Sequence, residues 1–155
     1  MTTIKIKEYF EDYTMHESVE SKGRTVTEGD INLYAGLTGD WHPLHTDVEF
    51  AKESLFGERI AHGPLVFSLV NGLCVQVPYS LPTYFIAAYG IDRMRFTAPT
   101  KIGDTLTAVA TVIKLEEKDA NYGVVTSEIK GLNQDKQVVC SYEAKMAVQR
   151  RPKSE

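Results

Sequence analysis

The chain lacks any apolar run long enough to cross a bilayer, and it has no surplus of basic residues. Among its 155 residues, 17 Lys and Arg stand against 21 Asp and Glu, a formal net charge of −4. The basic residues are not interleaved with aromatic ones, as a groove that follows a nucleic-acid backbone requires. A membrane-spanning helix needs about 20 mostly apolar residues, which no segment provides. We therefore expect neither nucleic acid nor a membrane as a partner.

Cysteine is also scarce, and no signal peptide is recognisable. The two cysteines, Cys74 and Cys140, lie in apolar segments at a spacing that matches no zinc or redox motif. We expect both to be buried free thiols, as in a reducing cytoplasm. Residues 1–12 carry charged residues among apolar ones and so lack the continuous apolar core of a signal peptide. These absences together predict a cytoplasmic protein.

The remaining composition predicts one α+β domain over residues 1–155. Hydrophobic residues make up 43% of the chain and charged residues 25%, and no repeat or linker divides it. Helical patterns come first, and strand patterns follow at residues 85–97, 105–112, 124–128 and 137–149, with a further possible strand at 17–26. This order favours a mainly antiparallel sheet around one apolar helix.

Two short helices are expected before residue 60. Thr27 and Asp30 form a capping-box pattern, with Asp in place of Glu, that predicts a helix ending near Gly39. His42 precedes a proline and is biased away from helix, so residues 40–46 are expected to form a turn or loop. Asp47 predicts the cap of a second helix that extends to about residue 55.

The best-defined helix is expected at residues 63–77. Gly63 and Pro64 suit a helix start, with proline at the first helical position, and Pro78 ends the run. Apolar residues cover nearly every face between these limits, which predicts a helix that is buried all round.

Asp40 and His45 are the candidate catalytic residues. Three of the four histidines fall within residues 42–62, and Asp40 directly precedes them. A carboxylate and an imidazole that share one water molecule can perform general acid–base chemistry. The alternative is that Asp40 caps local amides and His45 is a hydrogen-bonded structural residue. The spacing of this pair alone favours that alternative.

No metal site is expected, although Asp40, His42, His45 and Asp47 all carry ligand atoms. Their spacing within a proline-containing loop matches no common zinc motif. The simpler interpretation is that His42 holds the loop together by hydrogen bonding. We expect no cofactor either.

Further candidates lie around the long helix. The backbone N–H of Gly63, at the positive end of the helix dipole, can stabilise an oxyanion, although close packing explains a glycine there equally well. His62 is expected to be structural. Asn71 is a supporting candidate, because its amide can reach the site or bond to the backbone one turn earlier. Aromatic residues that are candidates for lining an acyl pocket, or for ordinary core, are Tyr34, Trp41, Tyr79, Tyr84 and Tyr89.

Residues 34–47, YAGLTGDWHPLHTD, resemble the signature of the MaoC-like dehydratases, the (R)-specific enoyl-CoA hydratase branch of the hotdog fold. That signature has an aromatic residue, then Ser/Thr-Gly-Asp-x-Asn-Pro-aliphatic-His-x-Asp. Residues 60–65, IAHGPL, are similar to its second segment, and residues 95–99 and 103–106 to its later strand and turn. The resemblance covers about residues 26–148.

The resemblance implies a hotdog fold, a homodimer or higher homo-oligomer, and an acyl-CoA substrate. It further implies reversible hydration of a trans-2-enoyl thioester to an (R)-3-hydroxyacyl thioester. Asp40 and His45 would be the catalytic pair around the water, and the Gly63 amide would bind the thioester oxygen. Which of the pair is acid and which base stays open, as does CoA against acyl carrier protein.

The sequence departs from the family pattern at three positions. His42 replaces the family's Asn, Pro64 replaces the common Met, and Asn71 stands where some members have Ser. The change at His42 suggests a different acyl substrate, such as a branched or carboxylated one. Two alternatives are a hotdog thioesterase and a non-catalytic acyl-CoA-binding accessory protein. The absence of Asp and Glu from residues 64–77 argues against the thioesterase, and the intact Asp–His pair argues against the accessory protein.

Overall fold

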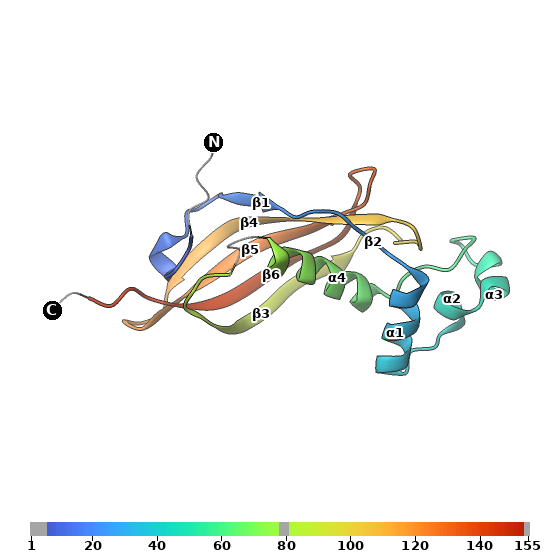
Figure 1. Ribbon diagram of the computed structural model, residues 1–155, viewed down its shortest axis with the longest axis horizontal. Coiled ribbons are helices and arrows are strands. Elements are labelled where there is room, and N and C mark those ends of the chain that lie inside the picture. Colours follow the sequence, from blue (N-terminus) through green and yellow to red (C-terminus); the bar gives the residue numbers. More distant parts are fainter. Residues whose placement is uncertain (1–5, 78–80, 154–155) are drawn as a thin grey trace.

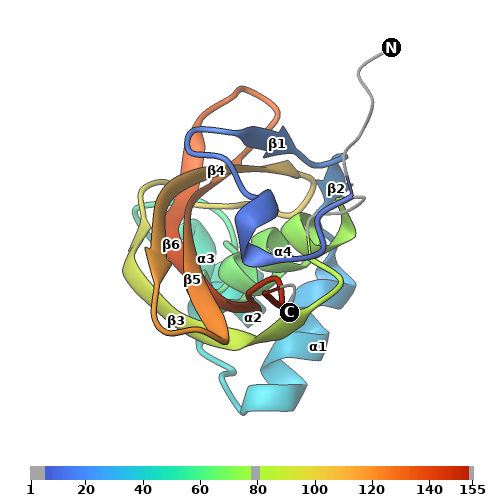
Figure 2. The ribbon, with the colours of Figure 1, turned by 90° about the vertical axis from the view of Figure 1, so that its left-hand side faces the viewer.

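A curved antiparallel sheet wraps around one long helix, α4, in the computed structural model, which describes residues 6–77 and 81–153 (Figures 1 and 2). The strands are β1 (Ser18–Glu20), β2 (Arg24–Thr25), β3 (Phe85–Phe96), β4 (Thr105–Glu117), β5 (Tyr122–Leu132) and β6 (Val138–Gln149). Their order is β1-β4-β5-β6-β3, and β2 pairs with β4. Every strand pair is antiparallel. The expected α+β class is confirmed.

The strand expected at residues 17–26 is divided into β1 and β2. Between them the Ser21 hydroxyl accepts a hydrogen bond from the Ala108 amide at 2.8 Å, where a continuous strand would offer a carbonyl. Gly23 follows, and a Cβ added to it would lie 3.0 Å from a Thr105 methyl group. The strand is therefore interrupted where the Ser21 side chain, instead of a backbone carbonyl, accepts a hydrogen bond from β4.

Helix α1 (Glu28–Thr38) begins at the predicted cap. The Thr27 hydroxyl accepts from the Asp30 amide at 3.3 Å, and the Asp30 carboxylate accepts from the Thr27 amide at 2.8 Å. Gly39 ends the helix in the left-handed conformation, with φ of 80°. The capping-box prediction and the predicted end near Gly39 are both confirmed.

The prediction of a turn or loop at residues 40–46 is wrong for the second half of this segment, which forms the short helix α2 (Pro43–Thr46). His42 has the extended backbone that a residue before proline favours, and it caps this helix. Pro43 then occupies the first helical position, where its missing N–H costs nothing. Helix α3 (Val48–Lys52) follows with Asp47 as its cap, and it ends at Lys52 rather than near residue 55.

Helix α4 (Gly63–Gln76) has the predicted start, and its end lies one residue before the predicted one. Leu65, Val66, Val70 and Leu73 are buried against the sheet. The opposite side carries a line of exposed residues, which we call the open stripe: Pro64, Ser68, Asn71 and Val75. The prediction that this helix is buried on every side is therefore wrong, because the sheet covers only one side of α4. Pro78, the expected stop, lies outside the described residues.

The two ends of α4 have different surroundings. Helices α1, α2 and α3 gather near its N-terminal end, and the N-terminal segment with the 3₁₀ helix η1 (Phe10–Asp12) lies toward its C-terminal end (Figures 1 and 2). In the part of the chain that the structure describes, strand β3 lies at the edge of the sheet and pairs only with β6. No helix among the described residues is long and apolar enough to span a membrane.

Candidate functional site

Asp40, His45 and His62 meet at the N-terminal end of α4. Asp40 directly follows the glycine that ends α1, His45 lies in α2, and His62 caps α4. One side-chain N or O atom from each lies within 4.8 Å of those of the other two. The structure therefore brings together the predicted pair, and it adds His62, which was expected to be structural.

Backbone carbonyls fix the orientation of both imidazoles. His45 Nδ1 donates to the Ile60 carbonyl at 2.7 Å, and His62 Nε2 donates to the Asp40 carbonyl at 3.0 Å. A carbonyl only accepts, so in neutral His45 the free lone pair is on Nε2. The two rings pack together, with centroids 3.9 Å apart and planes inclined by 32°. His45 is thus held as a proton acceptor with a fixed tautomer.

The environment favours the neutral form of His45. Burial is the largest cause that lowers its pKa, and the neighbouring histidines lower it further. The Ile60 carbonyl and the Asp40 carboxylate act in the opposite direction without reversing the shift. His45 is therefore a base at neutral pH, with a pKa below its ordinary value.

His62 is the residue whose position the sequence reasoning missed. Its side chain is 1% exposed, and its ring packs against Tyr34 at a centroid distance of 4.8 Å. Its Nδ1 is buried without a hydrogen-bond partner among the described residues. The available signal was its place before Gly63 in the IAHGPL segment, although sequence alone does not reveal the contact with His45.

The other two candidate ligand residues, His42 and Asp47, accept hydrogen bonds from nearby backbone amides. His42 Nδ1 accepts from the Leu44 amide at 3.1 Å, which agrees with its expected role in holding the loop. Asp47 Oδ1 accepts from the amides of Glu49 and Phe50. The cluster that offers metal ligands is instead Asp40, His45 and His62. Backbone carbonyls engage His45 Nδ1 and His62 Nε2, so His45 Nε2 and His62 Nδ1 are the ring nitrogens of this cluster without a hydrogen-bond partner among the described residues.

Gly63 is the first residue of α4, where amides have no carbonyl one turn earlier. Among the described residues, no hydrogen bond uses its N–H. A Cβ on Gly63 would lie 2.9 Å from the Phe96 ring, so close packing alone already demands glycine here. Both sequence-based explanations of this glycine therefore remain compatible with its surroundings.

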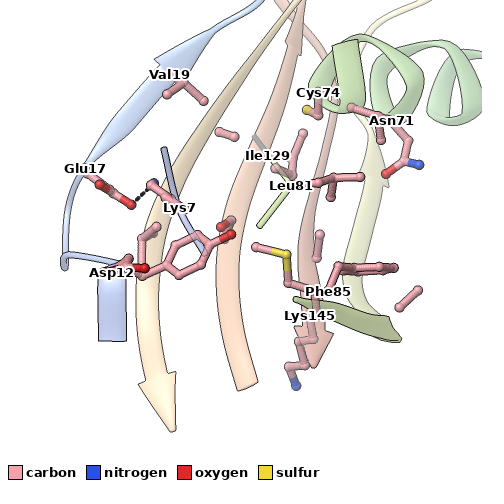
Figure 3. A pocket seen from close by; sticks show the side chains of 18 of the residues that line it. Lys7, Asp12, Glu17, Val19, Asn71, Cys74, Leu81, Phe85, Ile129 and Lys145 are labelled. Carbon is pink, nitrogen blue, oxygen red and sulfur yellow. Dashed lines mark hydrogen bonds and ion pairs between the residues drawn. The ribbon is translucent and has the colours of Figure 1, made fainter. Parts of the chain in front are cut away.

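A cavity of about 690 Å³ lies further along α4, between its C-terminal half and the sheet (Figure 3). Asn71, Cys74 and Val75 line it from α4. The Tyr142 hydroxyl approaches Asn71 Oδ1 at 3.5 Å. Neither cysteine forms a disulfide, and burial raises the pKa of each thiol to about 11; Cys140 is buried as expected, and Cys74 is half-buried.

The aromatic residues expected in an acyl pocket do not line this cavity. Tyr34, Trp41, Tyr84 and Tyr89 lie elsewhere, and Tyr79 is outside the described residues. The described aromatic residues that line the cavity are Tyr13 and Phe85. No sequence signal assigned a role to Tyr13, because its segment reaches the cavity only through the fold.

Comparison with known proteins identifies the family. The family described as "MaoC like domain" matches residues 11–132. The chain belongs to the MaoC-like family. A MaoC-like relative, the (R)-specific enoyl-CoA hydratase of Rhodospirillum rubrum, is 38% identical over 71% of this chain and 73% of its own length. Protein MaoC of Klebsiella aerogenes is 41% identical over 64% of this chain, which spans only 29% of that protein.

Solved structures agree with this assignment. The structure named monoamine oxidase regulatory protein, from Archaeoglobus fulgius, has a TM-score of 0.90 and 41% identity, with 96% of this chain and 98% of that chain covered. A Mycobacterium tuberculosis protein described as a double hotdog fold has a TM-score of 0.82 at 18% identity, over 96% of this chain and 46% of that chain. The expected hotdog fold is therefore confirmed.

Proposed function

We propose that this MaoC-like protein is a hydro-lyase that reversibly hydrates a trans-2-enoyl-CoA to an (R)-3-hydroxyacyl-CoA. The observation that carries the proposal is the convergence of Asp40 and His45 beside Gly63 at the start of α4. Named relatives support it: an (R)-specific enoyl-CoA hydratase, 3-hydroxyacyl-thioester dehydratases and a mesaconyl-CoA hydratase.

In the proposed mechanism, Asp40 and His45 hold one water molecule between them. Neutral His45 takes a proton from the water through Nε2 while the water oxygen bonds to C3 of the enoyl chain. The electron pair of the double bond moves toward the thioester oxygen, which accepts a hydrogen bond from the Gly63 N–H. The imidazolium of His45, stabilised by the Asp40 carboxylate, then returns the proton to C2 on the same face. Water is thereby added syn across the double bond.

We further propose a homodimer that forms along β3. This edge strand has no buried residue, and its exposed apolar side chains include Phe85, Ile86 and Tyr89. A long, apolar, unpaired edge is a surface that another strand completes. The open stripe of α4, on the side left uncovered by the sheet, would become buried in the same assembly.

The direct test follows the ultraviolet absorbance of the enoyl thioester with crotonyl-CoA and with branched and carboxylated enoyl-CoAs. We expect the absorbance to fall, with an (R)-3-hydroxyacyl product identified by chiral analysis. Release of free CoA, detected with a thiol reagent, would indicate a thioesterase instead. Binding of acyl-CoA by folded protein without turnover would indicate a non-catalytic accessory role.

A further inference from the structure

His62 occupies the cap position of α4, but its side chain does not cap the helix. Caps are usually Ser, Thr, Asp or Asn, whose short side chains accept from helix amides, and His62 forms no such bond. Its ring is buried instead, and its Nδ1 has no hydrogen-bond partner among the described residues. A buried polar atom without a partner costs free energy that an apolar ring would not. The start of α4 therefore does not explain why this residue is a histidine.

One contact of His62 holds the backbone of Asp40. His62 Nε2 donates to the Asp40 carbonyl at 3.0 Å, across 22 residues of sequence. The hydrogen bonds that Asp40 forms with Thr38 and His42 join it only to residues two positions away. Within the described residues, the bond from His62 is thus the hydrogen bond that ties Asp40 to the start of α4.

A second contact of His62 restrains the ring of His45. The hydrogen bond from His45 Nδ1 to the Ile60 carbonyl, 2.7 Å long, fixes one atom of that ring and still allows the ring to turn about the bond. The ring of His62 packs against the ring of His45, with centroids 3.9 Å apart, and restricts that rotation. Tyr34 packs against His62 in turn, at a centroid distance of 4.8 Å. The three rings thereby connect α1, α2 and the start of α4.

We propose that His62 is a positioning residue, which holds Asp40 and His45 in the arrangement that lets them share one water molecule. Gly63, the proposed oxyanion donor, directly follows His62 in the chain, so the same residue also lies beside the third proposed group. This inference rests on the proposed hydratase function. A displacement of about 1 Å in a reacting group can lower a rate about 10²-fold, so His62 should act on kcat.

Two substitutions separate the two contacts of His62. His62→Phe keeps a flat ring beside His45 but loses the N–H that binds the Asp40 carbonyl. His62→Gln keeps an N–H donor at a similar reach but loses the ring. We expect each variant to lower kcat for enoyl-CoA hydration by about 10- to 100-fold and to change KM by less than about twofold. Circular dichroism and Tm check that both variants fold.

A spectroscopic measurement follows His45 without any turnover. Imidazole ¹⁵N chemical shifts, recorded above the titration range of histidine, report which ring nitrogen carries the proton. The wild type should show His45 with its proton on Nδ1, bonded to the Ile60 carbonyl, and this signal is assigned by its loss in His45→Ala. His62→Gln should show a mixture of the two neutral forms of His45, whereas His62→Phe should keep the wild-type form.

Thr126→Val is the matched control. Thr126 is 2% exposed, its hydroxyl is also buried without a partner among the described residues, and it lies in β5, outside the site. The substitution should leave kcat, KM and the His45 signal at their wild-type values, even if Tm changes.

The two proposals fail in different ways. Wild-type kcat in either folded His62 variant, or a wild-type His45 signal in His62→Gln, would overturn the positioning role and leave hydration intact. If the wild type hydrates no enoyl-CoA, the proposed function fails, and the His45 signal alone decides the positioning role. A mixture in His62→Gln would then support that role, and a signal identical to the wild type would overturn it.

Discussion

The Asp40 carboxylate is exposed, and within the described residues it accepts one hydrogen bond, at 3.3 Å, from the His42 amide. An asparagine can accept that bond, so Asp40→Asn should fold normally. If Asp40 stabilises the imidazolium and holds the water, kcat/KM should fall by about 10²- to 10⁴-fold. The measurement is enoyl-CoA hydration, with circular dichroism and Tm as checks on folding.

Asp47→Asn is the matched control for that substitution. Asp47 caps α3, and asparagine is an equally good cap, so both the fold and the activity should be retained. Full activity in a folded Asp40→Asn variant would contradict the proposed mechanism.

The lowered pKa of His45 predicts how activity and stability depend on pH. Because neutral His45 is the base, the acid limb of kcat/KM should have its midpoint below the ordinary 6.5. The unfolded chain binds a proton on this residue before the folded chain does. The free energy of unfolding should therefore fall as the pH drops from 6.5 to the folded pKa.

A pH series of denaturant unfolding for the wild type and His45→Ala measures this contribution. The variant should lose part of the acid sensitivity in that window, together with orders of magnitude in activity. An acid limb above pH 6.5, or equal acid sensitivity in both proteins, would contradict the assignment.

At the scale of elements, the start of α4 is packed directly against β3. Gly63→Ala places a methyl group against the Phe96 ring, so it should lower the free energy of unfolding by about 1–3 kcal/mol and reduce activity. Alanine retains the N–H, so adding Phe96→Leu should restore both stability and most of the activity. Denaturant unfolding and kcat/KM of the single and double variants measure this. Restored stability without restored activity would show that more than packing was lost.

Elements with local signals were predictable from the sequence. The Thr27 capping box, the Gly39 end of α1 and the Gly63 start of α4 depend on neighbouring residues only, and the structure confirms all three. The open stripe of α4 and the division between β1 and β2 depend on which distant strand lies opposite. Hydrophobic periodicity contains no such information.

The residues of the site show the same difference between local sequence signals and contacts that the fold creates. Asp40 and His45 were found because they lie close together in the sequence within a recognisable pattern. His62 and Tyr13 were missed because one ring packs on His45 and the other lines the cavity, and both places are set by the fold. Both contacts join segments that only the fold brings together.

At the scale of the whole molecule, the exposed β3 edge predicts a dimer in solution. Ile86 is 53% exposed on this strand and lies outside the cavity lining. A charge on a strand edge opposes pairing, so Ile86→Lys should shift the protein toward monomer. Ile86→Thr keeps the β-branched shape and should remain dimeric. Light scattering coupled to size-exclusion chromatography measures both, and a monomeric wild type would contradict the prediction.

The separation of the two ends of α4 has a consequence for how such a protein can diversify. Every group proposed to handle protons or the oxyanion lies between Asp40 and Gly63, whereas the cavity along α4 is lined by residues outside that stretch, among them Tyr13, Asn71 and Ala144. Substitutions in the cavity lining can therefore change the shape of the cavity without replacing any of the proposed reacting groups. The cavity lining and the proposed chemistry occupy separate stretches of the chain, so each can change in evolution while the other is conserved.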